Sequence, residues 1–521
     1  MNLQSALSYQ PLELKFGTSG RRGEVIHLTD LEIYINTLAE LEYLQALPVD
    51  AGGIVRGEEF YCALDLRPSS ERLCRAIERA TRDAGMQPVN MGRIPTPALM
   101  YYAVSRGKGS IMVTGSHIPF DRNGYKLNTS RGELLKEHEQ PVGEAVRRVR
   151  ERIYGQDFAE SLFDERGSFK EGSGEAAPAS DAAASFYIER YVSFFGAGSL
   201  AGLRVAAYQH SAVGRDMLVD VLQRLGAEVI ACGRSEQFVP IDTENIEAPQ
   251  LAVIRQLVAK EGRLDAVVST DGDSDRPLVL AVDGEHVRFF GGDLVGMIVA
   301  EFLGADAVVV PITSNDAIDR GTLATALEPK TKIGSPYVIA GMEAARAKGR
   351  RTICGWEANG GFLTGSDIAR RGRILTALPT RDALLPILAV LTASKEKGKP
   401  LGEVFGELPQ RFSRAALLKN YPREQSRAVV ERFSEPDEAT RKALERVFSP
   451  ARGFGAIANL DYTDGVRIYF ANGDVAHFRP SGNADEFRIY AVADSQERAD
   501  EIVTMGVQEP DGLLRQLTAR T

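Results

Sequence analysis

A strand–helix–strand pattern recurs along the chain before residue 410, and it constrains the fold more than any other feature. Residues 58–92 predict a strand, an amphipathic helix and a second strand, and residues 202–233 repeat this plan. A third unit begins near residue 305. Alternating strands and helices favour parallel or mixed sheets covered by helices. We therefore predict three related α/β domains, each with a parallel or mixed sheet.

The chain after residue 410 follows a different pattern. A charged helical region covers residues 423–448, and residues 455–494 alternate apolar and polar side chains around the turn pair Asn472-Gly473. This predicts a smaller α+β domain at the C-terminal end. A segment rich in Gly, Ala, Ser and Glu separates the first two units and is interpreted as a linker. The predicted domains are 1–165, 186–288, 289–410 and 411–521, with the linker at 166–185.

Charge and cysteine content argue against several classes of protein. The 521 residues carry a net charge of -9 with a pI of about 5.5, which disfavours a general nucleic-acid or anionic-membrane surface. The four cysteines show no CxxC spacing, which argues against a disulfide framework and a zinc site. The sequence has no basic start followed by an apolar run and no long apolar segment. We expect a soluble cytoplasmic protein without nucleic-acid or membrane partners; nothing in the sequence specifies its oligomeric state.

Four loops stand out because short apolar strands run directly into polar, Gly-rich sequence. They lie at residues 114–126, 271–276, 356–361 and 479–488. In open α/β sheets, ligands bind at the carboxyl ends of the strands. We therefore expect these four loops to form the functional site.

The second loop carries three aspartates at alternate positions, Asp271, Asp273 and Asp275. Carboxylates in a small space raise one another's pKa, and a hard divalent cation relieves this, so the loop indicates Mg²⁺ or Ca²⁺. It is not an EF-hand, because Arg276 and Val282 stand where that loop needs Gly and Glu. Two alternatives stay open: a phosphatase that uses Asp271 as its nucleophile, and a solvated acidic turn.

In the first loop, Ser116 and His117 follow a buried-looking strand over residues 111–113. A serine beside a histidine suggests a nucleophile and a base, but serines are also ordinary turn residues. The pair alone therefore leaves a reacting serine and a turn serine both open.

The fourth loop has the composition of a phosphate clamp. Arg479 and Arg488 can fork onto phosphate oxygens, while Ser481 and the turn amides near Gly482 add donors. An exposed basic hairpin is the alternative. Near the N-terminus, residues 15–23 place cations among three glycines, which suits contact with an anion.

Taken in order, the four loops resemble those of the α-D-phosphohexomutase family, whose phosphomannomutases and phosphoglucomutases interconvert hexose 6- and 1-phosphates. Residues 114–119 and 123–126 resemble the family's Thr-Ala/Gly-Ser-His-Asn-Pro and Asn-Gly-x-Lys, and residues 271–276 resemble its Asp-Gly-Asp-x-Asp-Arg. Residues 356–361 and 479–485 resemble its sugar-reading and phosphate loops. The likeness runs nearly end to end. It implies three related α/β domains and a smaller C-terminal α+β domain around a central cleft.

The resemblance also implies roles for individual residues. Ser116 would be the phosphorylated residue, and one Mg²⁺ would bind to Ser116 and the three aspartates. Hexose phosphates would be the substrates and a hexose 1,6-bisphosphate the activator. The implied catalytic residues are Ser116, His117, Lys126, Arg22 and Arg276, with His117 and Lys126 both open as the proton-transfer group. The implied substrate-binding residues are Glu357, Asn359, Lys332, Arg479, Ser481, Gly482, Asn483 and Arg488.

Four residues depart from the family pattern, since Ile118, Trp356, Asn359 and Asn483 replace Asn, Gly, Ser and Thr. We predict a mutase acting on mannose phosphates, with glucose phosphates as an open second choice. The alternatives are a phosphoglucomutase or phosphoglucosamine mutase of the same fold, the phosphatase above, and a non-catalytic sugar-phosphate-binding protein. Because Trp356 lies beside Glu357 in the predicted sugar loop, we also expect its fluorescence to report ligand binding.

Overall fold

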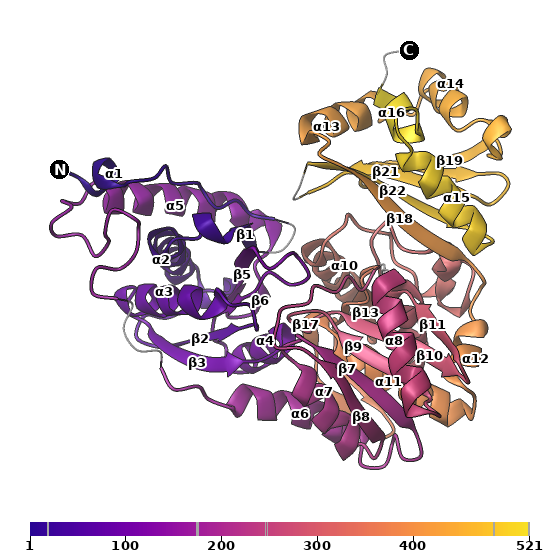
Figure 1. The fold of residues 1–521 in the computed structure, drawn as a ribbon, viewed down its shortest axis with the longest axis horizontal. Coiled ribbons are helices and arrows are strands. Elements are labelled where there is room, and N and C mark those ends of the chain that lie inside the picture. The colour runs from indigo at the N-terminus through magenta and orange to yellow at the C-terminus, as the bar shows by residue number, and fades with distance from the viewer. Residues whose placement is uncertain (18–19, 173–176, 245, 247, 483–484, 519–521) are drawn as a thin grey trace.

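The computed structural model describes residues 1–17, 20–172, 177–244, 246, 248–482 and 485–518. Figure 1 shows the N-terminal domain on one side, the C-terminal domain at the top on the other, and the remaining two domains packed together below. Among the helices of these ranges, none combines the length and apolar composition that a membrane span requires.

The first domain is built on a mixed six-stranded sheet with strand order β1-β5-β4-β2-β3 and β6 beside β5. β2 is parallel to β3 and β4, whereas β4 and β5 are antiparallel. The strands are β1 (Arg21–Glu24), β2 (Glu59–Leu64), β3 (Gln87–Arg93), β4 (Ser110–Val113), β5 (Arg122–Thr129) and β6 (Gly132–Glu133). The α-helices are α1 (Leu3–Ala6), α2 (Asp30–Ala46), α3 (Ser70–Asp83), α4 (Thr96–Ser105) and α5 (Glu139–Tyr154). The first predicted loop therefore leaves the carboxyl end of the central strand, β4.

The second domain has a mixed five-stranded sheet with strand order β11-β10-β9-β7-β8. β7 is parallel to β8 and β9, and β10 is antiparallel to both β9 and β11. The strands are β7 (Arg204–His210), β8 (Glu228–Arg234), β9 (Ala266–Thr270), β10 (Pro277–Asp283) and β11 (His286–Phe290). The helices are α6 (Ala182–Phe195), α7 (Arg215–Arg224) and α8 (Ala248–Glu261). The aspartate loop connects β9 to β10 at the carboxyl end of β9.

The third domain has a mixed four-stranded sheet with strand order β12-β13-β14-β17 and a separate hairpin of β15 and β16. Its strands are β12 (Ala307–Val309), β13 (Ile353–Trp356), β14 (Phe362–Thr364), β15 (Ile368–Arg370), β16 (Arg373–Leu375) and β17 (Leu378–Asp382). Its helices are α9 (Gly292–Leu303), α10 (Ser335–Ala347), α11 (Leu384–Lys397) and α12 (Leu401–Gly406). The predicted sugar loop connects β13 to β14. The expected set of three mixed α/β domains is thus confirmed.

The fourth domain is an antiparallel five-stranded sheet with strand order β18-β22-β21-β20-β19, as the predicted α+β domain requires. Its strands are β18 (Phe412–Lys419), β19 (Ile457–Asp461), β20 (Val466–Phe470), β21 (Val475–Pro480) and β22 (Glu486–Ala493). Its helices are α13 (Arg423–Arg432), α14 (Glu438–Val447), α15 (Gln496–Val507) and α16 (Leu513–Thr518). The fourth loop joins β21 to β22.

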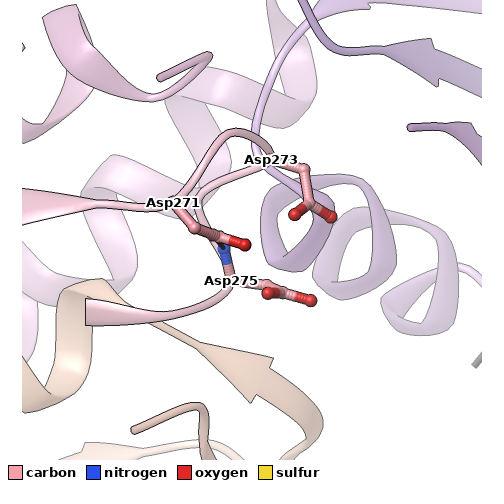
Figure 2. A group of neighbouring side chains, drawn as sticks. All are labelled: Asp271, Asp273 and Asp275. Atoms are coloured by element: carbon pink, nitrogen blue, oxygen red, sulfur yellow. Dashed lines mark hydrogen bonds between the residues drawn. The ribbon is translucent and has the colours of Figure 1, made fainter. Parts of the chain in front are cut away.

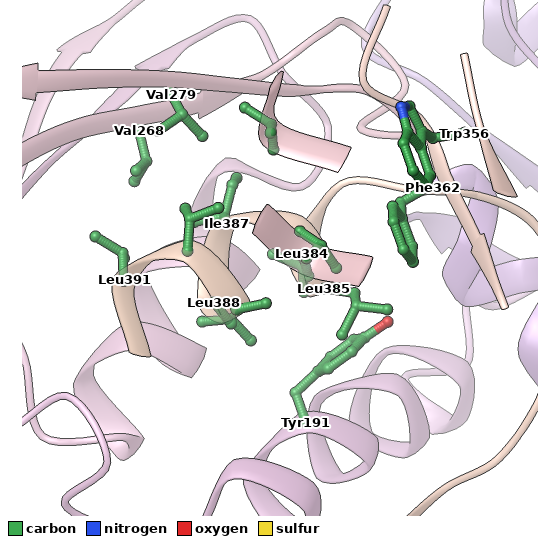
Figure 3. Close-up of a cluster of buried hydrophobic side chains, with 14 of the residues drawn as sticks. Tyr191, Val268, Val279, Trp356, Phe362, Leu384, Leu385, Ile387, Leu388 and Leu391 are labelled. Atoms are coloured by element: carbon green, nitrogen blue, oxygen red, sulfur yellow. The ribbon is translucent and has the colours of Figure 1, made fainter. Parts of the chain in front are cut away.

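One hydrophobic cluster runs through the first three domains, whereas the fourth has a core of its own. Figure 3 shows its centre, where Leu384 and Leu388 of α11 lie between Val268 of the second sheet and Phe362 of the third. Close packing of this kind resists deformation. The first three loops therefore stand on a common rigid support, while the fourth is carried by a separately packed unit.

Two described parts of the segment predicted as a linker, residues 166–172 and 177–185, pack against the neighbouring domains. Phe169 lies 7 % exposed in the core of the first domain, against Phe163, and α6 already begins at Ala182. The Gly- and Ala-rich composition did not reveal that Phe169 packs in the core of the first domain or that Ala182, Ala183 and Ala184 pack against the central hydrophobic cluster. The predicted domain boundaries themselves stay predictions.

Candidate active site

Ser116 lies at the end of the central strand and faces a loop from the second domain. It is fully buried, and its hydroxyl donates to Oδ2 of Asp271 over 2.8 Å. Its backbone has a φ of 54°, a region that non-glycine residues rarely adopt, and its amide donates to Oγ1 of Thr114. Nδ1 of His117 lies 3.5 Å from the hydroxyl. A strained turn that aims a hydroxyl at a carboxylate of another domain is typical of a functional loop.

The aspartate loop brings its three carboxylates together, as the sequence predicted. Asp271, Asp273 and Asp275 are buried, and each can place one oxygen within 4.8 Å of the others. Figure 2 shows the three side chains leaving one turn between β9 and β10 and pointing to a shared space. Oδ1 of Asp271 accepts hydrogen bonds from the amides of Asp275 and Arg276, at 3.1 and 3.2 Å. These bonds fix the orientation of the Asp271 carboxylate.

Donors from other elements occupy one oxygen each of Asp273 and Asp275. Nζ of Lys126 lies 2.6 Å from Oδ2 of Asp273 and 2.7 Å from Oδ2 of Asp275. Oγ1 of Thr96 also donates to Oδ2 of Asp273, and Nε of Arg381 to Oδ2 of Asp275. The Oδ1 atoms of both aspartates are buried and accept no hydrogen bond from the residues that the structure describes, although that of Asp275 lies 3.7 Å from Nε of Arg276. Two orphaned carboxylate oxygens beside Asp271 and Ser116 fit a hard divalent cation.

The charges of the triad are unevenly balanced. Burial raises the pKa of Asp271 well above its ordinary value, and the charges of Asp273 and Asp275 add to this rise. Burial acts in the same direction on Asp273, but Lys126, Thr96 and Arg381 together outweigh it and lower the pKa of Asp273. Burial and the charge of Asp273 oppose this at Asp275, but Arg381, Lys126 and Arg276 together outweigh them and lower its pKa as well. A divalent cation would let all three carboxyl groups ionise together.

His117 and two arginines complete the surroundings of Ser116. Burial and the charge of Arg276 hold the pKa of His117 well below its usual range, so the imidazole is neutral at pH 7. Nη1 of Arg276 lies 3.0 Å from Nδ1 of His117 and can only donate, so the ring proton sits on Nε2. Burial and Arg276 also lower the pKa of Arg22 to about 10, which leaves it protonated at neutral pH. The predicted catalytic residues thus meet at one place.

The predicted sugar loop lies next to this centre and is tied to it. Glu357 is 4 % exposed, and its Oε2 accepts from Nη1 of Arg381 over 3.2 Å. Since Arg381 also binds Asp275, one guanidinium joins the sugar loop to the aspartate loop. Oδ1 of Asn359 accepts from the amide of Gly361 over 2.9 Å, so this oxygen shapes the loop itself.

Trp356 is buried in the core, which weakens the reason for expecting it to report ligand binding. It is the last residue of β13 and only 1 % exposed, and its indole stacks on Phe362 with ring centroids 5.7 Å apart. Figure 3 shows the ring within the hydrophobic cluster. Successive strand residues point to opposite sides, so Glu357 and Trp356 cannot both face the site.

We therefore expect the fluorescence of the single tryptophan to be blue-shifted and poorly quenched by acrylamide in the native protein. A buried indole lies beyond the reach of the quencher, so hexose phosphates should change neither property much. The measurement is a Stern–Volmer titration of native protein, with protein unfolded in guanidinium chloride as control. Equal quenching of both samples would contradict the buried position.

The fourth loop places its cations against acidic partners. Nε of Arg479 lies 3.3 Å from Oδ1 of Asp464, and the guanidinium of Arg488 binds Glu486 at 2.8 and 3.2 Å. Ser481 is buried and Gly482 exposed, whereas Asn483 lies outside the described residues. The segment with the exposed Lys332 lies beside this loop, since the amide of Ile333 donates to Oδ2 of Asp464. Asp464 therefore contacts both Arg479 and the third-domain segment that carries Lys332.

A cavity of about 350 Å³ lies at the junction of the second, third and fourth domains. It is lined by Ala358 of the sugar loop, by Glu244 of the second domain and by Tyr490 of β22. Tyr490 is two residues from Arg488, so both lie on one face of β22. The predicted sugar loop and the strand that carries Arg488 therefore border a common space.

Sequence reasoning missed three residues of the site: Thr96, Arg381 and Glu244. Arg381 stands in the segment "PTRDAL", next to Asp382; this segment resembles one of the family, but the resemblance pointed to Asp382 and not to Arg381. Asp382 itself is buried and accepts hydrogen bonds from two tyrosines of α6, so it anchors β17 and takes no part in the site. No spacing along the chain signals these positions.

Comparisons with known proteins agree with this geometry. Family models described as phosphoglucomutase/phosphomannomutase alpha/beta/alpha domains I, II and III match residues 13–152, 186–284 and 291–412. A curated phosphomannomutase of Sinorhizobium fredii is 38 % identical over 493 residues, which covers 95 % of this chain and 98 % of that protein.

Solved structures share the fold. A phosphoglucomutase/phosphomannomutase family protein from Burkholderia thailandensis matches with a TM-score of 0.68 and 19 % identity over 98 % of both chains. An Aspergillus fumigatus N-acetylphosphoglucosamine mutase, solved with GlcNAc-6P and magnesium, matches with a TM-score of 0.54 and 16 % identity over 99 % of this chain and 98 % of that one.

Proposed function

Because the chain belongs to the α-D-phosphohexomutase family, we propose that it interconverts mannose 6-phosphate and mannose 1-phosphate through a phosphoserine at Ser116. Membership makes it a phosphohexomutase, an intramolecular phosphotransferase. The role of Ser116 is supported by the position of its hydroxyl, which is buried in the loop after β4 and lies 2.8 Å from the carboxylate of Asp271 in the aspartate loop.

In the proposed reaction, phosphorylated Ser116 donates its phosphoryl group to the free hydroxyl of a hexose monophosphate. The bond between phosphorus and the serine oxygen breaks as a bond to the sugar oxygen forms. The proton of the sugar hydroxyl passes to neutral His117, or to Lys126 in its neutral amine form, and the same group returns it to the oxygen of Ser116. The bisphosphate then turns over in the site and returns its other phosphoryl group to Ser116. Arg22 and Arg276 neutralise charge on the transferred group, since positioning and electrostatics supply most of the catalysis in phosphoryl transfer.

The aspartate loop is the proposed magnesium site. Asp271, Asp273, Asp275 and Ser116 would hold the ion, and the orphaned Oδ1 atoms of Asp273 and Asp275 support this assignment. When bound, Mg²⁺ supplies a Lewis acid that stabilises negative charge on the transferring phosphoryl group. Lys126, Thr96 and Arg381 orient the carboxylates by occupying their other oxygens.

The sugar and its second phosphate would bind the remaining two loops. We assign hydroxyl recognition to Glu357 and Asn359. The proposed ligands of the non-reacting phosphate are Arg479, Ser481, Gly482, Asn483, Arg488 and Lys332. A hexose 1,6-bisphosphate would phosphorylate Ser116 and so activate the resting enzyme.

A coupled assay tests the choice of sugar. Mannose 1-phosphate, glucose 1-phosphate and glucosamine 1-phosphate are compared at saturating Mg²⁺ with a catalytic amount of the matching bisphosphate. Identity of 38 % with a phosphomannomutase over almost the whole chain favours the highest kcat/KM on mannose 1-phosphate. A clear preference for glucose or glucosamine 1-phosphate would overturn that choice, and steady release of inorganic phosphate would indicate a phosphatase.

Replacing Arg479 by alanine should raise the KM for the hexose phosphate about 10- to 100-fold while kcat falls much less, because a charge-assisted fork to phosphate contributes roughly 1.5–3 kcal/mol. Initial rates over a wide substrate range give both constants. Arg515→Ala is the matched control, since Arg515 forms a surface ion pair with Glu509 in the same domain. An unchanged KM in Arg479→Ala would remove Arg479 from the phosphate site.

A further inference from the structure

Arg67 gathers the backbone of the phosphoserine loop around one guanidinium. Its Nη1 donates to the carbonyls of Pro119 and Arg122, and its Nη2 to those of Ser116 and Ile118, at 2.5 to 2.8 Å. The side chain is fully buried. Four carbonyls that point inward to one cation fix the path of residues 116–122.

Two close approaches show that the loop is built around this guanidinium. A Cβ on Gly115 would lie 2.6 Å from Cζ of Arg67, so any side chain there would displace it. A Cβ on Gly272 would lie 2.7 Å from the carbonyl oxygen of Ser116, which the same arginine holds. Glycine at both positions lets Arg67, the phosphoserine loop and the aspartate loop come together.

Arg67 is itself held from two sides. On one side, Nε lies 3.3 Å from Oδ2 of Asp65, whose carboxylate also accepts from Thr114 at the start of the loop. On the other, the guanidinium lies 4.0 Å from the ring centroid of Phe238, a residue of the second domain. A buried arginine on an aromatic face gains a cation–π interaction that strengthens when water is excluded. The contact therefore joins the phosphoserine loop to the second domain.

We propose that Arg67 is a positioning residue for Ser116 and that Phe238 holds Arg67 in place. The four hydrogens on Nη1 and Nη2 match the four carbonyls, so Arg67 acts through the loop and does not bind the substrate phosphate. Its effect is to keep Ser116 at a positive φ, with the hydroxyl aimed at Asp271. This inference rests on the proposed role of Ser116.

The test compares Arg67→Ala, Arg67→Lys and Phe238→Leu. Arg67→Ala should lower kcat about 100-fold with little change in KM, because a misplaced nucleophile loses catalysis without losing substrate affinity. Arg67→Lys should recover only part of this loss, since an ammonium cannot match four carbonyls. Phe238→Leu should cost about fivefold in kcat, and Phe238→Tyr should restore it.

Chemical rescue by free guanidinium distinguishes a positioning role of Arg67 from a purely structural one, because only the first predicts that kcat recovers. Guanidinium at millimolar concentration should raise kcat of Arg67→Ala by filling the vacated space, whereas it should not help Ser116→Ala. Arg204→Gln is the control, because Arg204 also binds a carboxylate and two carbonyls but at the amino end of β7, away from the site. Its activity should match wild type.

A double-mutant cycle separates the outcomes. If Phe238 acts through Arg67, Phe238→Leu should cause no further loss in the Arg67→Ala background. Wild-type kcat in Arg67→Ala, a defect confined to KM, or additive losses would overturn the inference. If Arg67→Ala fails to fold, the cycle is run on Arg67→Lys. Absence of mutase activity in the wild-type protein would contradict the proposed function, which keeps the two failures distinct.

Discussion

Replacing Ser116 by alanine is expected to lower mutase turnover on the order of 10⁴-fold or more, because no other group can carry the phosphoryl group between the two sugar oxygens. The variant should fold normally. It loses one hydroxyl that donates to Asp271, and such a bond contributes about 1 kcal/mol to stability. The measurements are the coupled assay at saturating bisphosphate and thermal unfolding followed by circular dichroism. Mass spectrometry of wild-type protein should find phosphate on the peptide that contains Ser116.

A matched control removes a serine hydroxyl from β4, the strand that precedes Ser116. Ser110 is fully buried in β4, and its Oγ accepts from Asn128 over 3.0 Å. Ser110→Ala therefore perturbs the same strand without touching the reacting group and should keep most of the activity. Wild-type turnover in Ser116→Ala would contradict the phosphoserine mechanism. Phosphate found only on a peptide that lacks Ser116 would also contradict it.

The fold and the main loops could be predicted because each rests on a local pattern. Strands of short apolar residues end in Ser116 and Asp271, and the carboxyl ends of such strands are where α/β sheets bind ligands. That the two residues meet, at 2.8 Å, follows only from how the domains pack. The motifs were sufficient to predict that Ser116 and Asp271 belong to the site, whereas their hydrogen bond could be found only in the structure.

The supporting arginines could not be predicted, for a physical reason. Arg67 and Arg381 act on carbonyls and carboxylates that are distant in sequence, so no local spacing marks them. For Trp356, closeness in the sequence was misleading. Its neighbour Glu357 lies next to the aspartate loop, but the alternation of side chains along the strand directs the indole into the core. Adjacency in the sequence is therefore a poor guide to adjacency in the site.

Removal of divalent metal is expected to abolish turnover, and added Mg²⁺ should restore it. Without a cation, ionisation of all three carboxyl groups is disfavoured, since burial and the two neighbouring charges raise the pKa of Asp271. Asp273→Asn removes one charge while keeping the shape, so it should raise the Mg²⁺ concentration for half-maximal activity at least about tenfold. Assays after EDTA treatment and dialysis, with Mg²⁺ added back in steps, measure both effects.

Metal binding can also be measured without catalysis, which separates loss of the ion from loss of chemistry. Electron paramagnetic resonance of Mn²⁺ should show one bound ion per chain in wild type and weaker binding in Asp273→Asn. Asp283→Asn is the control, because Asp283 is an exposed aspartate at the end of β10 in the same sheet. Full activity after thorough chelation would refute the metal assignment. Lys126 and Arg381 would then be the cations that balance the aspartates during the reaction, and the orphaned Oδ1 atoms would need another partner.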